Sequence, residues 1–98
     1  MVETQFVDHA QGTQAKIGTT LVGIMRVGDA DGRGVAQLMI RSSHGDLVET
    51  AFEGDEVAIP DDGFAVIGAA TPPDAENPRW RIALGHRAKR EGDPRSTP

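Results

Sequence analysis

Apolar and polar residues alternate in short runs along this chain, and glycine, proline and aspartate separate the runs. Alternation with a period of two is typical of β-strands that expose one face, and no segment carries the period of an amphipathic helix. The pattern predicts an all-β chain with about six to seven strands, folded as a small antiparallel β-sandwich or a partly open β-barrel. The predicted strands lie near residues 4–7 and at 19–27, 35–42, 47–52, 57–59, 64–67 and 80–84.

The clearest hairpin signal lies at residues 52–70, where two apolar runs flank Pro60-Asp61-Asp62-Gly63. Proline presets φ and glycine tolerates positive φ, so these residues favour a tight four-residue loop. Such a loop pairs Ile59 with Phe64 and places both side chains on the core face. The complete predicted core face of this hairpin comprises Val57, Ile59, Phe64 and Val66.

The opposite face of the same hairpin is predicted to be apolar as well. It comprises Ala58, Ala65, Ile67 and Ala69, none of which is charged. A solvent-facing side normally alternates to polar residues, so this face needs a cover. Either the domain covers it with its own segments at 19–27 or 71–79, or the face meets another chain. Small side chains permit close approach and few residues remain to cover them, so the pattern favours an interface.

Two further loops set the register of the remaining strands. Residues 28–34 are interpreted as a hairpin loop rather than an EF-hand calcium loop, because arginine and isoleucine occupy two of the ligand positions. A loop at residues 44–46 is predicted to pair Leu38 with Phe52, which keeps apolar residues on one face. The segment 19–27 is apolar on both alternating sets, so we expect both of its faces to be covered.

Length and composition indicate one small domain. A chain of 98 residues buries roughly 60–70% of its unfolded surface, which suffices for one core without a metal or disulfide. The absence of cysteine excludes disulfides and thiolate zinc sites. The first residues lack the basic start and apolar stretch of an export signal, and no apolar run approaches about 20 residues, so we expect a cytoplasmic protein.

The net charge of −5 conceals two regions of opposite sign. Residues 1–78 carry 13 acids and 4 bases, whereas residues 79–98 carry 6 bases and 2 acids. The acidic region repels nucleic acid and anionic membranes, so neither is an expected partner. Residues 87–98 are charged and contain proline, which predicts a disordered tail after a single β domain at residues 1–86.

The chain's one tryptophan lies among basic residues, an arrangement that also occurs in nucleic-acid-binding patches. Trp80 is in phase with Ile82 and Leu84, so we expect its ring to fill the core. A buried ring offers no platform on which bases can stack, which again argues against nucleic acid.

No group of residues in the sequence carries a recognisable chemistry. His9, His44 and His86 are far apart and share no metal-ligand spacing, so neither a metal nor a cofactor is predicted. The serines, histidine and aspartate at 42–46 are favoured turn residues, and neighbours on one turn cannot converge as a catalytic triad. The acids at 53–62 could act on glycosides only if they faced each other across a cleft. We therefore predict no catalytic residue.

One stretch resembles a known group of proteins. The residues Glu-Gly-Asp-Glu-Val-Ala-Ile at 53–59, followed by Phe-Ala-Val at 64–66, resemble short actinobacterial proteins of unknown function. The resemblance covers well under half of the chain. It implies a small β fold and no particular site.

Taken with the composition, these patterns favour a non-enzymatic module for protein–protein contact. Such a module would be an accessory, regulatory or assembly subunit, for example of a phage or other particle, and its partner would be another protein or a second copy of itself. The first alternative is a small-ligand or carbohydrate-binding β domain, and the second is a small β-barrel enzyme. A ligand binder requires a concave apolar pocket with convergent polar groups, whereas an assembly subunit requires an exposed apolar surface.

Overall fold

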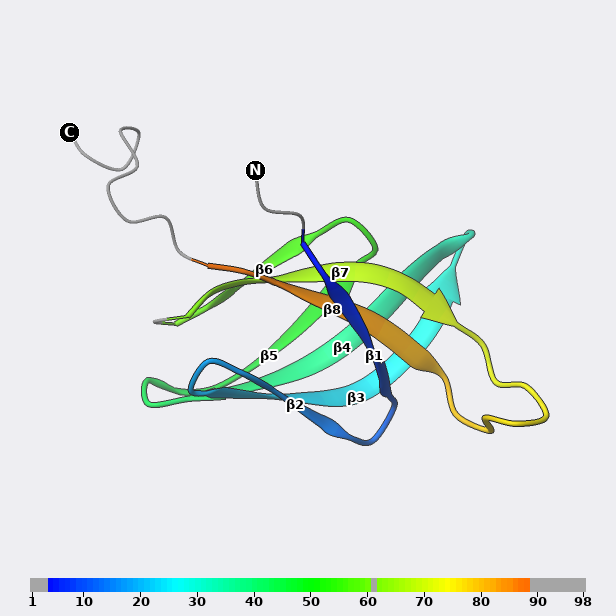
Figure 1. The fold of residues 1–98 in the computed structure, drawn as a ribbon, viewed down its shortest axis with the longest axis horizontal. Helices are drawn as coiled ribbons and strands as arrows, with labels where there is room; N and C mark the ends of the chain where they lie inside the picture. The colour runs from blue at the N-terminus through cyan, green and yellow to red at the C-terminus, as the bar shows by residue number, and fades with distance from the viewer. Residues whose placement is uncertain (1–3, 61, 89–98) are drawn as a thin grey trace.

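The computed structural model describes residues 4–60 and 62–88, which form β-strands joined by turns and loops (Figure 1). The eight strands are β1 (Phe6–Ala10), β2 (Gln14–Ile17), β3 (Thr20–Ala30), β4 (Arg33–Ser42), β5 (Gly45–Phe52), β6 (Glu56–Ile59), β7 (Gly63–Thr71) and β8 (Arg81–Arg87). The described residues include no helix that is long and apolar enough to cross a membrane.

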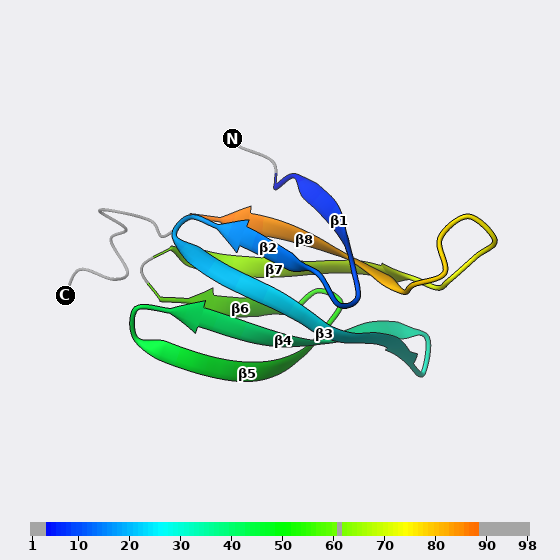
Figure 2. The same ribbon diagram turned by 90° about the horizontal axis from the view of Figure 1, so that it is seen from below.

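The strands form two four-stranded antiparallel sheets that pack against each other (Figure 2). One sheet has the strand order β1-β8-β7-β6, and the other has the order β2-β3-β4-β5. Short corners at residues 11–13 and 53–55 carry the chain from one sheet to the other. The predicted β-sandwich is confirmed. The structure has eight strands rather than six to seven, because the run at residues 14–17 is too short and too polar to predict β2.

The core lies between the two sheets and is built from alternating positions of the central strands. Its largest fully buried apolar side chains are Val22, Ile24, Leu38, Ile40, Ile67 and Ile82. Each such side chain contributes roughly 1.5–3 kcal/mol when it leaves water. Four of them come from β3 and β4, so this pair forms the larger half of the core.

β3 is covered on one face only, which corrects the prediction for residues 19–27. Val22 and Ile24 are buried, whereas Leu21 and Met25 on the other alternating set are exposed. Val27 belongs to that second set by number, but a bulge between Ile24 and Arg26 turns it inward and it is buried. The strand also continues to Ala30, and the predicted loop at 28–34 is reduced to a tight turn whose central residues, Asp31 and Gly32, have φ of 53° and 83°. Positive φ at both positions is characteristic of a two-residue hairpin turn.

The β6–β7 hairpin has a register one residue away from the predicted one. Ile59 pairs with Gly63 rather than Phe64, so the inward face of β7 consists of the odd-numbered residues instead of the even-numbered ones. Ala65 and Ile67 are therefore core residues, each 1% exposed, whereas Phe64 is only half-buried. The face predicted as an interface does not exist as a unit, because Ala65 and Ile67 point inward, and a bulge between Ile67 and Ala70 changes the alternation of β7 beyond them.

The β4–β5 hairpin also differs from its predicted register, here by three residues. Ser42 pairs with Gly45 and Leu38 with Glu49, which leaves a two-residue loop at residues 43–44. Phe52, predicted opposite Leu38, lies opposite Val35. Most of β5 is exposed on both faces, so burial of apolar residues did not decide this register.

The C-terminal strand confirms part of its prediction. Ile82 and Leu84 are buried as expected, but Trp80 precedes β8 and is half-buried against the edge of the core. Arg87 belongs to β8, where it lies opposite Phe64, so the β domain extends beyond residue 86. Most of the predicted tail, residues 89–98, lies outside the described residues.

Candidate functional site

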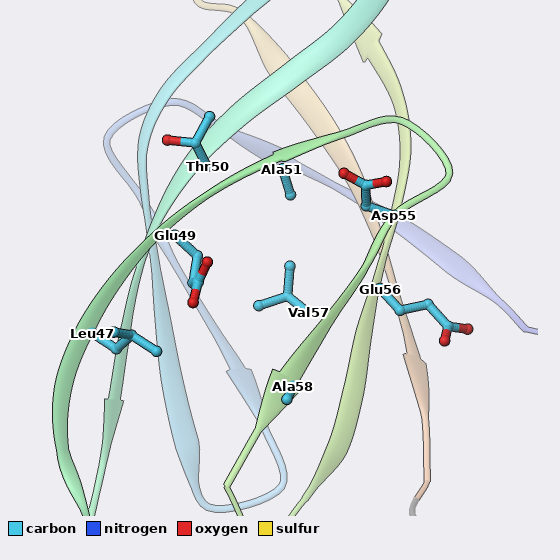
Figure 3. A pocket seen from close by; sticks show the side chains of 8 residues that line it. All are labelled: Leu47, Glu49, Thr50, Ala51, Asp55, Glu56, Val57 and Ala58. Atoms are coloured by element: carbon cyan, nitrogen blue, oxygen red, sulfur yellow. The ribbon is translucent and has the colours of Figure 1, made fainter.

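A cleft of about 350 Å³ opens between β5 and β6, the edge strands of the two sheets (Figure 3). Its lining combines aliphatic and acidic side chains, with no lysine or arginine. The lining residues are Leu47, Glu49, Thr50, Ala51, Asp55, Glu56, Val57 and Ala58. The close-up shows Leu47, Glu49 and Val57 directed into the space between the two strands.

The inward side of β5 is set by its pairing with β4. Ile40 is a core residue and lies directly opposite Leu47, and side chains of directly opposed residues point to the same face of a sheet. Leu47 therefore faces the interior of the sandwich, yet it is 50% exposed, whereas Ile40 is 1% exposed. The same reasoning places Glu49, opposite Leu38, on the inward side.

The cleft is open because the two edge strands differ in length. β5 has eight residues, whereas β6 has four and ends at Ile59, where Pro60 begins the turn to β7. The strands are joined by the corner at residues 53–55 and bow apart beyond it, so that Leu47 and Glu49 face Val57 and Ala58 across an open space (Figure 3). β6 lines the far side of this space but does not bury Leu47, which stays half exposed.

Both walls of the cleft present backbone groups that have no hydrogen-bond partner among the described residues. The N–H of Glu53 donates to the Gly34 carbonyl at 2.9 Å, and alternate residues of an antiparallel strand face the same neighbour. Residues 47, 49 and 51 therefore direct their backbone groups to β4, as Glu53 does. The N–H and C=O groups of the residues between them, Asp46, Val48 and Thr50, point away from β4. These three residues form the hydrogen-bonding edge of β5.

The edge of β6 follows from the same alternation. The N–H of Ile67 in β7 donates to the Asp55 carbonyl at 2.9 Å. Glu56 and Ala58 therefore direct their backbone groups away from β7 and toward the cleft. Each wall thus offers donors and acceptors of the kind that another strand would bind.

The three carboxylates of the lining differ in their partners. Asp55 accepts a hydrogen bond from the Phe52 N–H at 2.9 Å, which closes the corner. Glu56 pairs with Arg87, and its side chain points away from the cleft in Figure 3. Glu49 has no hydrogen bond or ion pair with any other described residue. It is thus the one acid of the lining, among the described residues, that has its charge directed into the cleft without a partner.

The residues predicted to form an interface are distributed over three environments. Ala58 is exposed and lines the cleft, Ala65 and Ile67 are in the core, and Ala69 is exposed on β7. We also considered that the domain covers these side chains itself. This holds for Ala65 and Ile67, because the sheet with the order β2-β3-β4-β5 packs over them.

The other polar clusters have structural roles. Ser42 Oγ accepts a hydrogen bond from the His44 N–H at 3.1 Å within the β4–β5 turn. Asp62 accepts hydrogen bonds from Thr19 and Thr20, and its carbonyl accepts one from the His86 ring. Asp61 lies outside the described residues. Within residues 4–60 and 62–88, no three or more histidines and acids come together in a way that could hold a metal ion.

Sequence reasoning did not find the cleft, although one signal of it is present. Leu47 and Val48 are consecutive apolar residues between Asp46 and Glu49, which breaks strict alternation and leaves an apolar side chain on each face of the strand. Comparison with protein-family models, curated proteins and solved structures gives no match to this chain. The site must therefore be interpreted from its own geometry.

Proposed function

We propose that this protein is a non-enzymatic binding module that contacts another protein through the β5–β6 edge. The observation that carries the proposal is Leu47, an inward-facing leucine that remains half exposed beside a hydrogen-bonding strand edge. A protein segment bound at this edge would remove the Leu47 side chain from water and would give the outward backbone groups of β5 hydrogen-bond partners. An accessory, regulatory or assembly subunit, for example of a phage or other particle, would use such an edge.

The alternatives receive less support from the same cleft. Pockets for small molecules enclose most of their ligand, whereas this cleft is open along its length between two strands. Two of its three carboxylates, those of Asp55 and Glu56, already have partners, which leaves no pair of acids free for glycoside chemistry. The acidic lining also disfavours nucleic acid and anionic membranes as partners. A cytoplasmic location remains part of the proposal.

The test is partner capture with matched variants of the full chain. Leu47→Lys places a charge at the cleft, and Leu21→Lys places the same charge at an exposed position on the outer face of β3. We expect wild type and Leu21→Lys to capture the same protein from a lysate of the native host, and Leu47→Lys to lose it while remaining folded by circular dichroism. Equal capture by both variants, or none by the wild type, would contradict the proposal. If the partner is a second copy, light scattering of the wild type gives twice the monomer mass and Leu47→Lys gives the monomer.

A further inference from the structure

We propose that the cleft accepts an extended segment of a partner protein as an added strand on β5, with an apolar side chain against Leu47 and a lysine or arginine against Glu49. The inference rests on the proposed function and specifies the chemistry of its partner. Three observations support it: the free backbone edge of β5, the spacing of Leu47 and Glu49, and the sign of charge around the cleft.

Of the devices that normally prevent strand addition, β5 carries one, the inward-facing charge of Glu49, which a basic residue on the added strand would neutralise. Edge strands of soluble proteins are commonly protected by lysine, proline, a β-bulge or short length. β5 is eight residues long, contains neither lysine nor proline, and pairs with β4 without a register shift. By contrast, the edge strand β2 is four residues long and carries Lys16. An added strand would hydrogen-bond to the outward groups of Asp46, Val48 and Thr50.

The inward side chains specify the added strand. Leu47 and Glu49 are two residues apart and face the same side, so residues opposite them in a new strand are also two apart. The residue opposite Leu47 would enter the 350 Å³ space beside Val57 and should be apolar. The residue opposite Glu49 would meet a carboxylate that has no partner among the described residues and should be basic. The expected motif is therefore an apolar residue and a basic residue separated by one position.

Two other occupants fit less well. Residues 89–98 contain Lys89, Arg90 and Arg95 but no valine, leucine, isoleucine, methionine or aromatic residue, so this segment supplies charge without an apolar side chain for Leu47. A second copy that offered its own β5 would bring Asp46 and Glu49 near the same acidic cleft, and like charges across a strand pair are destabilising. A basic and apolar segment from a different protein satisfies both requirements.

The experiment uses two acetylated and amidated peptides, TVTKTVT and TVTETVT, titrated into the full-length protein and followed by amide resonances in NMR spectra. Both peptides are symmetric, so either strand direction presents valine, the central charge and valine on one face. We expect TVTKTVT to give saturable shifts in β5 and β6, and TVTETVT to bind at least about fivefold more weakly. In the variant Glu49→Lys the preference should reverse, with shifts in the same strands.

Several outcomes overturn the inference. The absence of saturable shifts in β5 and β6 would contradict strand addition at the cleft. Equal affinity for both peptides would contradict the preference for a basic residue opposite Glu49. Binding only to a chain that ends after Ala88 identifies residues 89–98 as the occupant. A dimer mass that TVTKTVT does not reduce identifies a second copy. If Leu47→Lys still abolishes partner capture while the peptides show no charge preference, the proposed function stands and only the added-strand chemistry fails.

Discussion

Asp62 joins two turns that are distant in sequence, and it does so with a single carboxylate oxygen. Its Oδ2 accepts hydrogen bonds from the Thr19 N–H at 3.2 Å, the Thr19 hydroxyl at 3.1 Å and the Thr20 hydroxyl at 2.8 Å. Thr20 is buried, so its hydroxyl needs such a partner. Hydrogen bonds to the charged carboxylate, first of all that from Thr20, lower the pKa of Asp62 below its ordinary value of 3.8.

Asp62→Asn should therefore destabilise the protein at pH 7 and less so in acid. A carboxylate whose pKa is lowered by folding stabilises the native state above its unfolded pKa, and this stabilisation is lost as pH falls through the lower folded pKa. The difference in free energy of unfolding between wild type and variant should still be present at pH 5 and should shrink below pH 3.8. Denaturant titrations across this pH range measure it.

A double-mutant cycle controls for unrelated effects of the asparagine. Thr20→Val removes the hydroxyl that lowers the pKa of Asp62 most, at nearly constant volume. Because the two residues share a hydrogen bond, the double variant should lose less stability than the sum of the single variants. Additive losses that do not vary with pH would refute the role assigned to Asp62.

Ile67→Lys should unfold the protein, or cost at least several kcal/mol, because it buries an unpaired charge in the core. Ile67 is 1% exposed. The matched control is Ala69→Lys, two residues along the same strand and exposed, which should remain folded with stability close to that of the wild type. Urea titrations of both variants provide the test, and a well-folded Ile67→Lys would contradict the observed register of β7.

At the level of strands, sequence predicted the elements better than their registers. Alternation placed most of β3, β4, β5 and β8 and the all-β class, because the period of two is a local property of each run. Register depends on turn geometry and on which residues the opposite sheet covers. Pro60 and Gly63 are both favoured turn residues, but their presence alone did not distinguish a pairing of Ile59 with Phe64 from the observed pairing with Gly63.

The candidate site was missed for a related reason. An open cleft arises from the difference in length between β5 and β6 and from the way these strands bow apart, neither of which is encoded in the alternation of one segment. Leu47 appears in the sequence as an ordinary strand residue. Its pairing with Ile40 and the sheet order together show that it faces inward at a sheet edge, where it stays half exposed.

Gly34→Ala should destabilise the contact between the two sheets by roughly 1–3 kcal/mol, because it overpacks a tight crossing. A Cβ added at Gly34 would lie 2.9 Å from the Cβ of Ala70 and 3.0 Å from its backbone nitrogen, so β4 and β7 would have to separate. Gly28→Ala is the control, since its nearest neighbour would be a Val35 methyl at 4.0 Å. In urea titrations, the free energy of unfolding of Gly34→Ala should be clearly lower than that of Gly28→Ala. Equal values would contradict the prediction and show that β4 and β7 can move apart at no cost.

At the scale of the whole molecule, one basic residue, Arg87, connects the last strand to the rest of its sheet. Arg87, at the end of β8, forms an ion pair with Glu56 of β6. The Cζ atom of its guanidinium group also lies 5.0 Å from the centroid of the Phe64 ring in β7. Arg87 thus connects β8 to β6 and β7 across the outer face of their sheet. The basic segment predicted as a tail therefore begins with a residue that belongs to the folded domain.

Two truncations should separate this residue from the segment that follows it. A chain that ends after Ala88 should keep the full free energy of unfolding, because residues 89–98 have no large apolar side chain with which to offset the entropy of ordering them. A chain that ends after His86 should lose about 1 kcal/mol, since it also removes the ion pair and the ring contact of Arg87. Urea titrations of the two chains and the full-length protein measure both differences. A loss of more than about 1 kcal/mol on ending the chain after Ala88 would show that residues 89–98 contribute to the fold.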